Sequence, residues 1–406
     1  MNSTAVTKIR RRLHDQGLAA YVAYTPSNVF YVTGFRSYFL SEWWRMHGTV
    51  FAVVPADETA PVTLVVSDFE SGAARGAAPD VGRSTYRLWV DLHTAGDLAA
   101  PPEPDAVPRP AQYDPRKLDE ALAHALAGLG TTAGRLATDL RFLSLDAYRR
   151  LQRAAPHADW VDFTDDAYEV RLVKEPWEVD RLALGVELSE AGITYATNRA
   201  TQGMSARDVR LLFQTGVTQA AAADPRYAGY TDNWVLPSVG SQTSASYGER
   251  GTGLQPGDLV KFDCGATVDG YRCDGGRTFS FQRLLPDAER LYTVLREAQS
   301  IARRLIRPGT VVGDVFRAAM AHVHANGYPS YNRGHVGHSV GIDTFHEEPP
   351  YISPDCTTVL EPGMVFAVEV PTYTPDVGAV MIEDMLVVTG DGARQLHALP
   401  HDLVVI

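Results

Sequence analysis

The chain has few cysteines and lacks both long apolar segments and internal repeats. It contains three cysteines in 406 residues, and this small, odd number without a secretory leader predicts reduced thiols in a cytoplasmic protein. No apolar run reaches the roughly 20 residues that a membrane-spanning helix needs. No repeat occurs at the periods of solenoid proteins. We therefore expect neither a disulfide-stabilised secreted module, nor a membrane protein, nor a repeat array.

Basic residues are outnumbered by acidic ones. The sequence has 37 Lys and Arg against 49 Asp and Glu, which gives a formal net charge of -12. Such a charge disfavours sequence-independent binding to nucleic acids or to acidic membranes, so we expect neither as a partner. Hydrophobic residues make up 45% of the chain, enough for sizeable cores, and the length suggests two domains or three.

Strand-like and helix-like segments alternate in the first part of the chain, which predicts an α/β domain. Asn28 to Gly34 reads as a turn, and the proline-rich stretch 95–112 as an exposed loop without regular structure. The segments that read as buried strands are residues 18–24, 48–54 and 62–67.

The composition shifts near Asp165. Shortly afterwards, Pro176 is suited to the first turn of a long helix, and Ser205 is a candidate N-cap for the next helix. We therefore predict a boundary here, with one domain over residues 1–165 and a second over residues 166–406.

Residues 260–281 (VKFDCGATVDGYRCDGGRTFSF) read as two β-strands joined at Asp269-Gly270. Asp-Gly between β-prone runs is a strong indication of a two-residue type I′ hairpin. This turn sets the register, and it predicts that Asp263 lies opposite Gly276.

In that register Asp274 shares a sheet face with Asp263 as its diagonal neighbour, with Cβ atoms roughly 7 Å apart. Two carboxylates this close repel each other unless a cation lies between them, and one or two metal ions would supply that charge. The alternative is a solvated hairpin face that binds nothing. Cys264 and Cys273 fall on the opposite face, where we expect them in the core.

Three further residues could join the two aspartates. His338 lies in a glycine-rich segment that lets the backbone approach closely, although a lone histidine can also be structural. Glu369 lies in the apolar strand predicted over residues 363–370, and Glu383 in the one predicted over residues 379–388. A buried carboxylate needs a partner, so two strands with the same anomaly suggest a common cause.

Together these residues make an oxygen-dominated donor set of four carboxylates and one imidazole. Such a set suits two divalent ions, with Mn²⁺ as the first choice and Fe²⁺, Co²⁺ or Zn²⁺ as alternatives. Two such ions can acidify a shared water and polarise a carbonyl oxygen, as hydrolysis requires. The five predicted metal ligands are Asp263, Asp274, His338, Glu369 and Glu383.

The chain from about residue 170 to its end resembles the pita-bread metallopeptidases, which include aminopeptidase P, prolidase and methionine aminopeptidase, with creatinase as a metal-free relative. DCGATVDGYRCDGGRTF, GHSVG, EPGMVFAVEV and VMIEDMLVV are similar to the segments that carry the family's five metal ligands. LAAYVAYTPSNVFYVTGF is similar to the α/β domain that precedes the catalytic domain in several members. The resemblance implies a creatinase/prolidase-like N-terminal α/β domain, an α+β pita-bread catalytic domain and a homodimer.

The sequence departs from the family around the predicted metal ligands. Ser246 and Tyr247 stand where proline-specific members usually carry a histidine, and Met381 stands where an arginine is common. Phe345 occupies the usual place of the second histidine, and His346 follows it. His335 lies three residues before His338 rather than four.

The resemblance implies a two-metal hydrolase in which a bridging hydroxide attacks an amide carbonyl. Glu369 or a neighbouring carboxylate would handle the proton, and His346 or His335 would stabilise the oxyanion. The expected substrate is a short Xaa-Pro peptide, with Ser246, Tyr247, Phe345 and Met381 among the residues that contact it. One alternative is a small non-peptide substrate: creatine or ectoine for hydrolysis, or a sulfonium propionate for a lyase reaction. Another is a binding module without catalysis.

Overall fold

The computed structural model describes residues 2–44, 49–101, 107–127, 133–240, 253–343 and 345–406. The chain divides into two compact units, Met1–Arg171 and Leu172–Ile406. This division falls within the last helix of the first unit, six residues after the boundary suggested by composition. None of the helices in the described ranges is long and apolar enough to cross a membrane.

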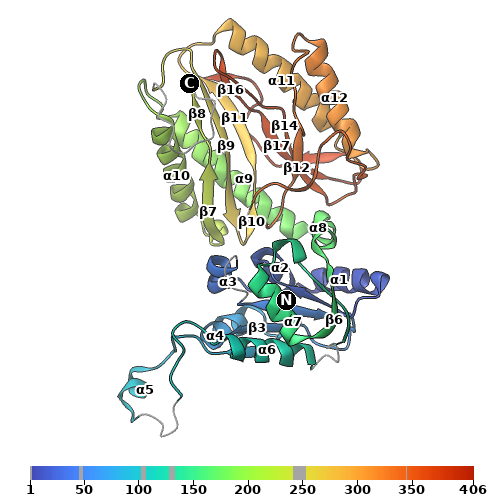
Figure 1. Cartoon of the computed structure of the whole chain (residues 1–406). Helices are drawn as coiled ribbons and strands as arrows, with labels where there is room; N and C mark the ends of the chain where they lie inside the picture. Colours follow the sequence, from blue (N-terminus) through green and yellow to red (C-terminus); the bar gives the residue numbers. More distant parts are fainter. Residues whose placement is uncertain (1, 45–48, 102–106, 128–132, 241–252, 344) are drawn as a thin grey trace. The chain divides into compact units, whose positions relative to one another are not determined.

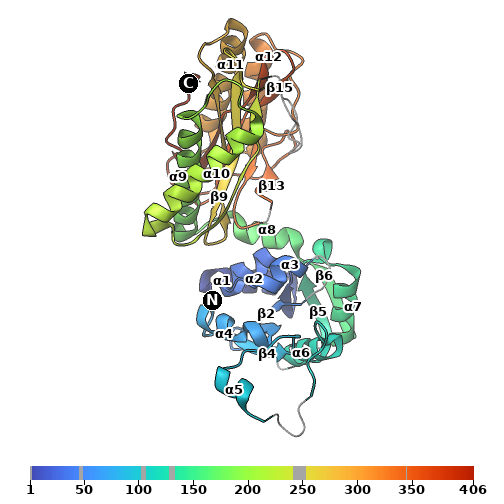
Figure 2. The ribbon, with the colours of Figure 1, turned by 90° about the vertical axis from the view of Figure 1, so that its left-hand side faces the viewer.

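The first unit is built on a six-stranded mixed sheet in the order β4-β3-β2-β1-β5-β6. Helices α1 and α2 lie on one side of this sheet and α6 on the other (Figure 2). The strands are β1 (Ala20–Ala23), β2 (Phe51–Pro55), β3 (Thr63–Ser67), β4 (Gly82–Tyr86), β5 (Ala133–Thr138) and β6 (His157–Asp162). The helices are α1 (Ser3–Gln16), α2 (Pro26–Thr33), α3 (Tyr38–Trp43), α4 (Asp68–Ala77), α5 (Ala95–Ala99), α6 (Pro115–Ala127), α7 (Leu145–Ala154) and α8 (Thr164–Leu172), with a 3-10 turn at Leu140–Phe142.

Two sequence-based predictions for this unit are wrong. The expected turn from residue 28 is helix α2, because Thr25 caps it by accepting from the Asn28 amide and Pro26 supplies a pre-set first turn. Buried Asp139 fixes the same corner by accepting from the backbone amides of Tyr24 and Thr25 at 2.9 and 3.1 Å. The predicted irregular loop 95–112 begins with the short helix α5, which a capping box stabilises.

The second unit is built on an eleven-stranded sheet whose central order is β10-β9-β11-β17-β14-β12-β13 (Figure 1). The helices are α9 (Pro176–Thr197), α10 (Ala206–Ala223), α11 (Pro286–Leu305) and α12 (Val312–Ala325), with a 3-10 turn at Pro225–Tyr227. The strands are β7 (Tyr230–Val235), β8 (Ser238–Val239), β9 (Leu259–Val268), β10 (Tyr271–Arg272), β11 (Gly275–Ser280), β12 (Gly337–Ser339), β13 (Glu348–Tyr351), β14 (Val365–Glu369), β15 (Thr372–Thr374), β16 (Gly378–Val380), β17 (Glu383–Val388), β18 (Ala393–Gln395) and β19 (Val404–Val405).

The predicted starts of the first two helices in this unit agree with the structure, but one predicted strand does not. Pro176 opens α9, and Ser205 caps α10. The single strand expected over residues 379–388 is two strands, because the chain leaves its hairpin partner β15 after β16 and joins the large sheet at β17.

Helices α9 and α11 cover the same face of the large sheet at two places. Ser189 of α9 lies 3.2 Å from the sulfur of Cys264 on β9, and Gln299 of α11 donates to Asp384 on β17 at 2.8 Å. Side chains alternate between the faces of a strand, so the neighbouring Asp263 and Glu383 point to the opposite face. The helices thus leave that opposite face to the polar residues.

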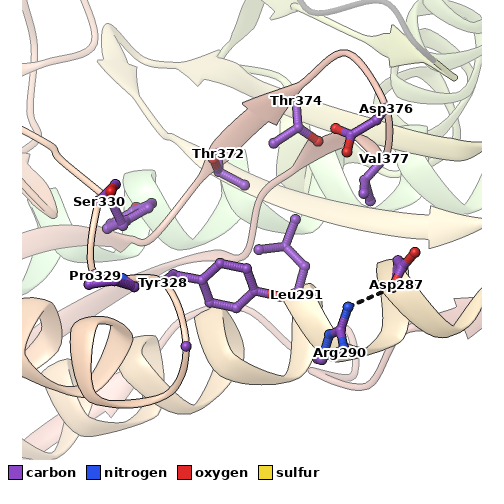
Figure 3. A pocket seen from close by; sticks show the side chains of 12 residues that line it. Asp287, Arg290, Leu291, Tyr328, Pro329, Ser330, Thr372, Thr374, Asp376 and Val377 are labelled. Carbon is purple, nitrogen blue, oxygen red and sulfur yellow. Dashed lines mark hydrogen bonds and ion pairs between the residues drawn. The ribbon is translucent and has the colours of Figure 1, made fainter.

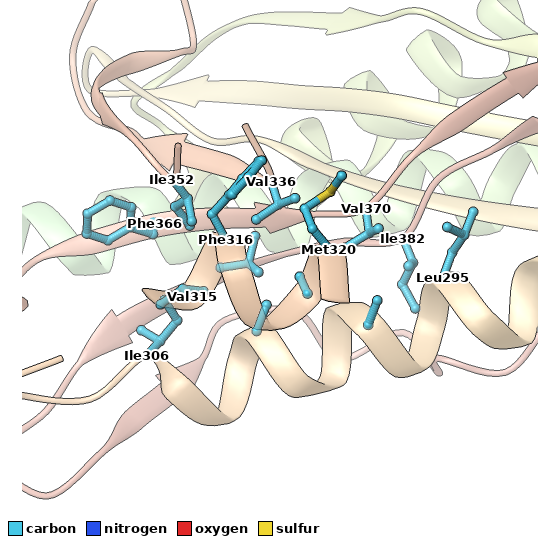
Figure 4. Packing of buried hydrophobic residues seen from close by; sticks show 14 of the residues in the cluster. Leu295, Ile306, Val315, Phe316, Met320, Val336, Ile352, Phe366, Val370 and Ile382 are labelled. Carbon is cyan, nitrogen blue, oxygen red and sulfur yellow. The ribbon is translucent and has the colours of Figure 1, made fainter. Parts of the chain in front are cut away.

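An apolar core packs between helices α11 and α12 and the strands of the large sheet. Leu295 of α11 and Phe316 of α12 pack with Phe366 of β14 in one buried cluster (Figure 4). Each large side chain buried in this way contributes about 1.5–3 kcal/mol. The sheet that presents the polar residues on one face is therefore packed against this apolar core on its other face.

Candidate metal centre

Three acidic residues and one glycine form a row of paired positions across four neighbouring strands. Asp263 on β9 is paired with Gly276 on β11, as the hairpin register predicts, and Gly276 is paired in turn with Glu383 on β17. Glu383 is paired with Glu369 on β14. Paired residues share a face, so the three carboxylates point the same way. The predicted turn is also confirmed, since Asp269 and Gly270 have φ values of 46° and 88°.

Gly276 lies at the middle of this row, where there is no room for a larger side chain. A Cβ atom at this position would lie 2.4 Å from the sulfur of Met381 and 2.9 Å from the backbone oxygen of Phe262. Both distances are shorter than a van der Waals contact allows. A larger residue would therefore displace Met381 or the strand, and the row depends on glycine here.

Asp274, His338 and Glu383 form the tightest cluster of the predicted ligands. One potential ligand atom from each lies within 4.8 Å of the others, and all three side chains are buried. The Nε2 atom of His338 is 3.4 Å from Asp274 Oδ2 and 3.8 Å from Glu383 Oε1. Its Nδ1 atom lies 3.0 Å from the backbone oxygen of Ser339, to which it donates, so Nε2 faces the carboxylates.

The electrostatics of this cluster fit a cation. Burial raises the pKa of Asp274 to about 6. Burial, followed by the charge of Asp274, raises the pKa of Glu383 well above its usual value. For His338, burial lowers the pKa, but the hydrogen bond and charge of Asp274 outweigh that effect and raise it to about 9. The cluster thus retains protons at neutral pH, and a divalent ion would provide the same positive charge.

The other two predicted ligands, Asp263 and Glu369, form ion pairs with cationic side chains that were not identified from the sequence. Asp263 Oδ2 lies 3.3 Å from the ammonium of Lys261, and Glu369 Oε1 lies 2.7 Å from the guanidinium of Arg333. Burial lowers the pKa of Lys261, but the charges and hydrogen bonds of Asp263 and Tyr373 together outweigh this effect and raise the pKa. Alternation could have revealed Lys261, because a residue two positions before Asp263 shares its face.

The hairpin of β15 and β16 covers Lys261. Thr372 and Thr374 line a cavity of about 480 Å³ between this hairpin, α11 and the loop at residues 327–331 (Figure 3). Tyr373, between the two threonines, points the other way, and its ring centroid lies 5.4 Å from the Lys261 ammonium.

Two histidines border the cluster. The Nε2 atom of His346 is 3.7 Å from Asp274 Oδ2, and its ring stacks on Trp234 with centroids 4.0 Å apart and an interplanar angle of 7°. Burial, then the charge of His338, lowers the pKa of His346 to about 3, so the ring is neutral. His335 Nδ1 is 3.6 Å from Glu369 Oε1. The stacking residue Trp234 was not identified from the sequence.

The four predicted substrate contacts differ in burial, and only two of them lie in the described part of the chain. Met381 is buried beside Gly276, next to the carboxylate row. Phe345 is 56% exposed, with its ring centroid 4.6 Å from that of His346. Ser246 and Tyr247 lie outside the described residues.

Two family models match the chain. The model of metallopeptidase family M24 matches residues 181–390, and the model of the creatinase/prolidase N-terminal domain matches residues 6–173. Among curated relatives, the putative dipeptidase YkvY of Bacillus subtilis (strain 168) is 26% identical over 402 residues and covers 99% of both chains. The Xaa-Pro dipeptidase of Lactobacillus helveticus is 30% identical over 273 residues, which is 65% of this chain and 70% of the relative.

Solved structures share the fold of the whole chain. An Xaa-Pro dipeptidase from Bacillus anthracis has a TM-score of 0.80 at 18% identity and covers 100% of both chains. The prolidase from Pyrococcus horikoshii OT3 has a TM-score of 0.77 at 20% identity, with coverage of 98% of this chain and 99% of that one. The predicted fold class, an α/β domain followed by an α+β pita-bread domain, is confirmed.

Proposed function

This chain belongs to metallopeptidase family M24, and on that premise we propose that it is a dipeptidase of the prolidase type that hydrolyses Xaa-Pro bonds with divalent metal ions. The observation that carries the proposal is the buried cluster of Asp274, His338 and Glu383, whose ligand atoms converge within 4.8 Å. A divalent ion bound there would acidify a water molecule and polarise the peptide carbonyl. We propose Mn²⁺ as the ion and a homodimer as the assembly.

The side chains of the site have separate roles in this proposal. Asp274, His338 and Glu383 would hold the first ion, and Asp263 and Glu369, at the two ends of the row, would complete the ligand set. Glu369 is the proposed acceptor of the proton released during attack, because its carboxylate lies at the end of the row, with His335 Nδ1 3.6 Å from its Oε1 atom.

His346 is the proposed donor to the oxyanion that develops on the substrate carbonyl. Its neutral ring can donate one hydrogen bond, and the stack on Trp234 holds the ring in one orientation. His335, beside Glu369, is the alternative donor.

The test is hydrolysis of defined peptides by protein loaded with Mn²⁺. We expect release of proline from Gly-Pro and Ala-Pro. The tripeptide Ala-Pro-Ala distinguishes a dipeptidase from an aminopeptidase, which would release alanine from it. Asp274→Ala should abolish turnover, whereas Glu289→Gln, a matched change of an exposed acid on α11, should not alter it. Full activity of Asp274→Ala would refute the assignment.

A small non-peptide substrate is the second candidate. Met381 favours it, because an apolar side chain occupies the position beside the carboxylate row where related peptidases commonly carry an arginine. Absence of turnover of all three peptides by the Mn²⁺-loaded protein would favour this candidate over the first, and creatine, ectoine and a sulfonium propionate would then be assayed.

A further inference from the structure

Arg272 on β10 is a cation on the same face of the sheet as the carboxylate row. It is paired with Thr267 of β9, which lies four residues after Asp263, so the three side chains share that face. Arg272 also precedes Asp274 by two residues, a spacing of about 6.5–7 Å along an extended chain. The long side chain of Arg272 can therefore reach a group that is bound beside an ion at Asp274.

Trp234 connects this cation to the predicted metal ligands. Trp234 is paired with Gly265 of β9, which places its side chain on the same face. The guanidinium carbon of Arg272 lies 5.4 Å from the ring centroid of Trp234, and the Trp234 ring stacks on that of His346 at 4.0 Å. The Nε2 atom of His346 lies 3.7 Å from Asp274 Oδ2. Guanidinium, indole and imidazole thus form a continuous series of contacts that ends at the cluster.

Arg272 has a buried donor without an acceptor. Its Nε atom has no hydrogen-bond partner among the described residues, and the same is true of the buried Nε1 atom of Trp234. The acid paired with Arg272 is Asp232, at 3.7 Å, and the side chain of Asp232 is 60% exposed. Exposed ion pairs of this kind are weak. Buried donors without an acceptor are rare in native proteins, and a negatively charged ligand would supply one here.

A carboxylate is the acceptor that the candidate substrates share. An Xaa-Pro dipeptide carries its carboxylate three bonds from the carbonyl carbon that is attacked, about 3–4 Å away. Creatine, ectoine and a sulfonium propionate carry a carboxylate too. A guanidinium can bind this group through two parallel hydrogen bonds. Met381, beside Gly276, offers no charge for this purpose at the position where an arginine is common in related peptidases.

We propose that Arg272 binds the carboxylate group of the substrate, next to the ion held by Asp274, His338 and Glu383. The inference rests on the proposed function and names a contact that restricts it to dipeptides. In a longer peptide the same carbon belongs to an amide, which carries no negative charge. Arg272 is thus a specificity-determining residue, and it neither binds the metal nor transfers a proton.

The test compares Gly-Pro with Gly-Pro-amide, which lacks the carboxylate, as substrates of the Mn²⁺-loaded protein. The unaltered protein should prefer Gly-Pro in kcat/KM by about tenfold to a hundredfold, as expected for one charge-assisted contact. Arg272→Met should raise KM for Gly-Pro by this factor and leave both constants for the amide unchanged, because the contact exists before and during the reaction. Arg272→Lys keeps the charge without the two parallel bonds and should recover part of the loss.

Arg226→Met is the matched control. Arg226 also lies over an aromatic ring, that of Tyr227 at 5.1 Å, and pairs with an aspartate, Asp224 at 2.8 Å. It should change neither KM. If Arg272 only holds Trp234 in place, Arg272→Met should lower kcat equally for both substrates, and this result would overturn the inference. Equal kcat/KM for both substrates in the unaltered protein would overturn it too, and that measurement needs no variant to fold.

Calorimetry on the Mn²⁺-loaded protein separates this inference from the proposed function. The probes are proline and prolinamide for the peptide source, and creatine, ectoine and a sulfonium propionate for the non-peptide source. The inference predicts that a carboxylate probe binds to the unaltered protein and about tenfold or more weakly to Arg272→Met. Such a loss without peptide hydrolysis would contradict the proposed function alone. Peptide hydrolysis without any dependence of KM or probe binding on Arg272 would contradict the inference alone.

Discussion

A buried ion pair behind the carboxylate row offers a quantitative test of the structure. Arg277 on β11 lies 2.5 Å from Asp384 on β17, with side chains 2% and 0% exposed. Gln299 and His401 contact the other carboxylate oxygen of Asp384, both at 2.8 Å. We predict that Asp384→Ala lowers the free energy of unfolding of the unit Leu172–Ile406 by about 3 kcal/mol, because it leaves the guanidinium buried without its counter-charge.

The size of the predicted stability loss depends on the hydrogen bonds that Arg277 keeps in the variant. Breaking a buried pair on one side costs about 3–5 kcal/mol. The lower end applies because Arg277 also donates to the backbone oxygens of Gly276 and Glu383, at 2.8 and 2.7 Å. In a domain of 150–250 residues, each kcal/mol shifts Tm by about 2–4 °C. The expected loss is therefore about 6–12 °C.

The assay is thermal unfolding followed by circular dichroism, with Asp402→Ala as the matched control. Asp402 also pairs with an arginine, Arg296, but its side chain is 81% exposed. An exposed pair contributes about 0–1 kcal/mol, so the control should lose at most about 4 °C. If Asp384→Ala loses no more than Asp402→Ala, the buried pair does not stabilise this sheet as argued.

Three further changes test other parts of the account. Trp234→Leu removes the stacking surface of His346, so kcat for Xaa-Pro hydrolysis should fall about tenfold or more while the metal content, measured by mass spectrometry, stays the same. Gly276→Ala brings a Cβ atom within 2.4 Å of Met381, and calorimetry should show weaker metal binding together with about 1–3 kcal/mol of lost stability. Asp139→Ala leaves the backbone donors at the start of α2 unpaired, and chemical unfolding should report a loss of about 2–4 kcal/mol in the first unit.

Local chemistry made the hairpin predictable. Asp269 and Gly270 adopt positive φ values, and the two-residue turn sets every pairing that follows, including Asp263 with Gly276. The anomaly of acids in apolar strands also led to Glu369 and Glu383, which the sheet brings to adjacent positions. These inferences needed only strand alternation and the cost of burying charge.

Features that depend on distant parts of the chain were harder to predict. The ion pair of Arg333 with Glu369 joins residues on separate segments, and neither position indicates the other in the sequence. The stack of Trp234 on His346 is non-local in the same way. The helix at Pro26–Thr33 was missed because Asn28 to Gly34 was read as a turn, and the N-cap Thr25 and Pro26 that precede this segment were not recognised as a helix start.

The central claim is that Asp274, His338 and Glu383 bind a divalent ion. Calorimetric titration of the chelator-treated protein with Mn²⁺ tests it most directly, with Asp274→Ala as the variant and Asp287→Ala, an exposed aspartate of α11, as the control. The account predicts that the unaltered protein and the control bind at least one ion tightly, and that Asp274→Ala loses this ion while remaining folded. Binding by Asp274→Ala that equals the unaltered protein, or no binding by the unaltered protein, would contradict it.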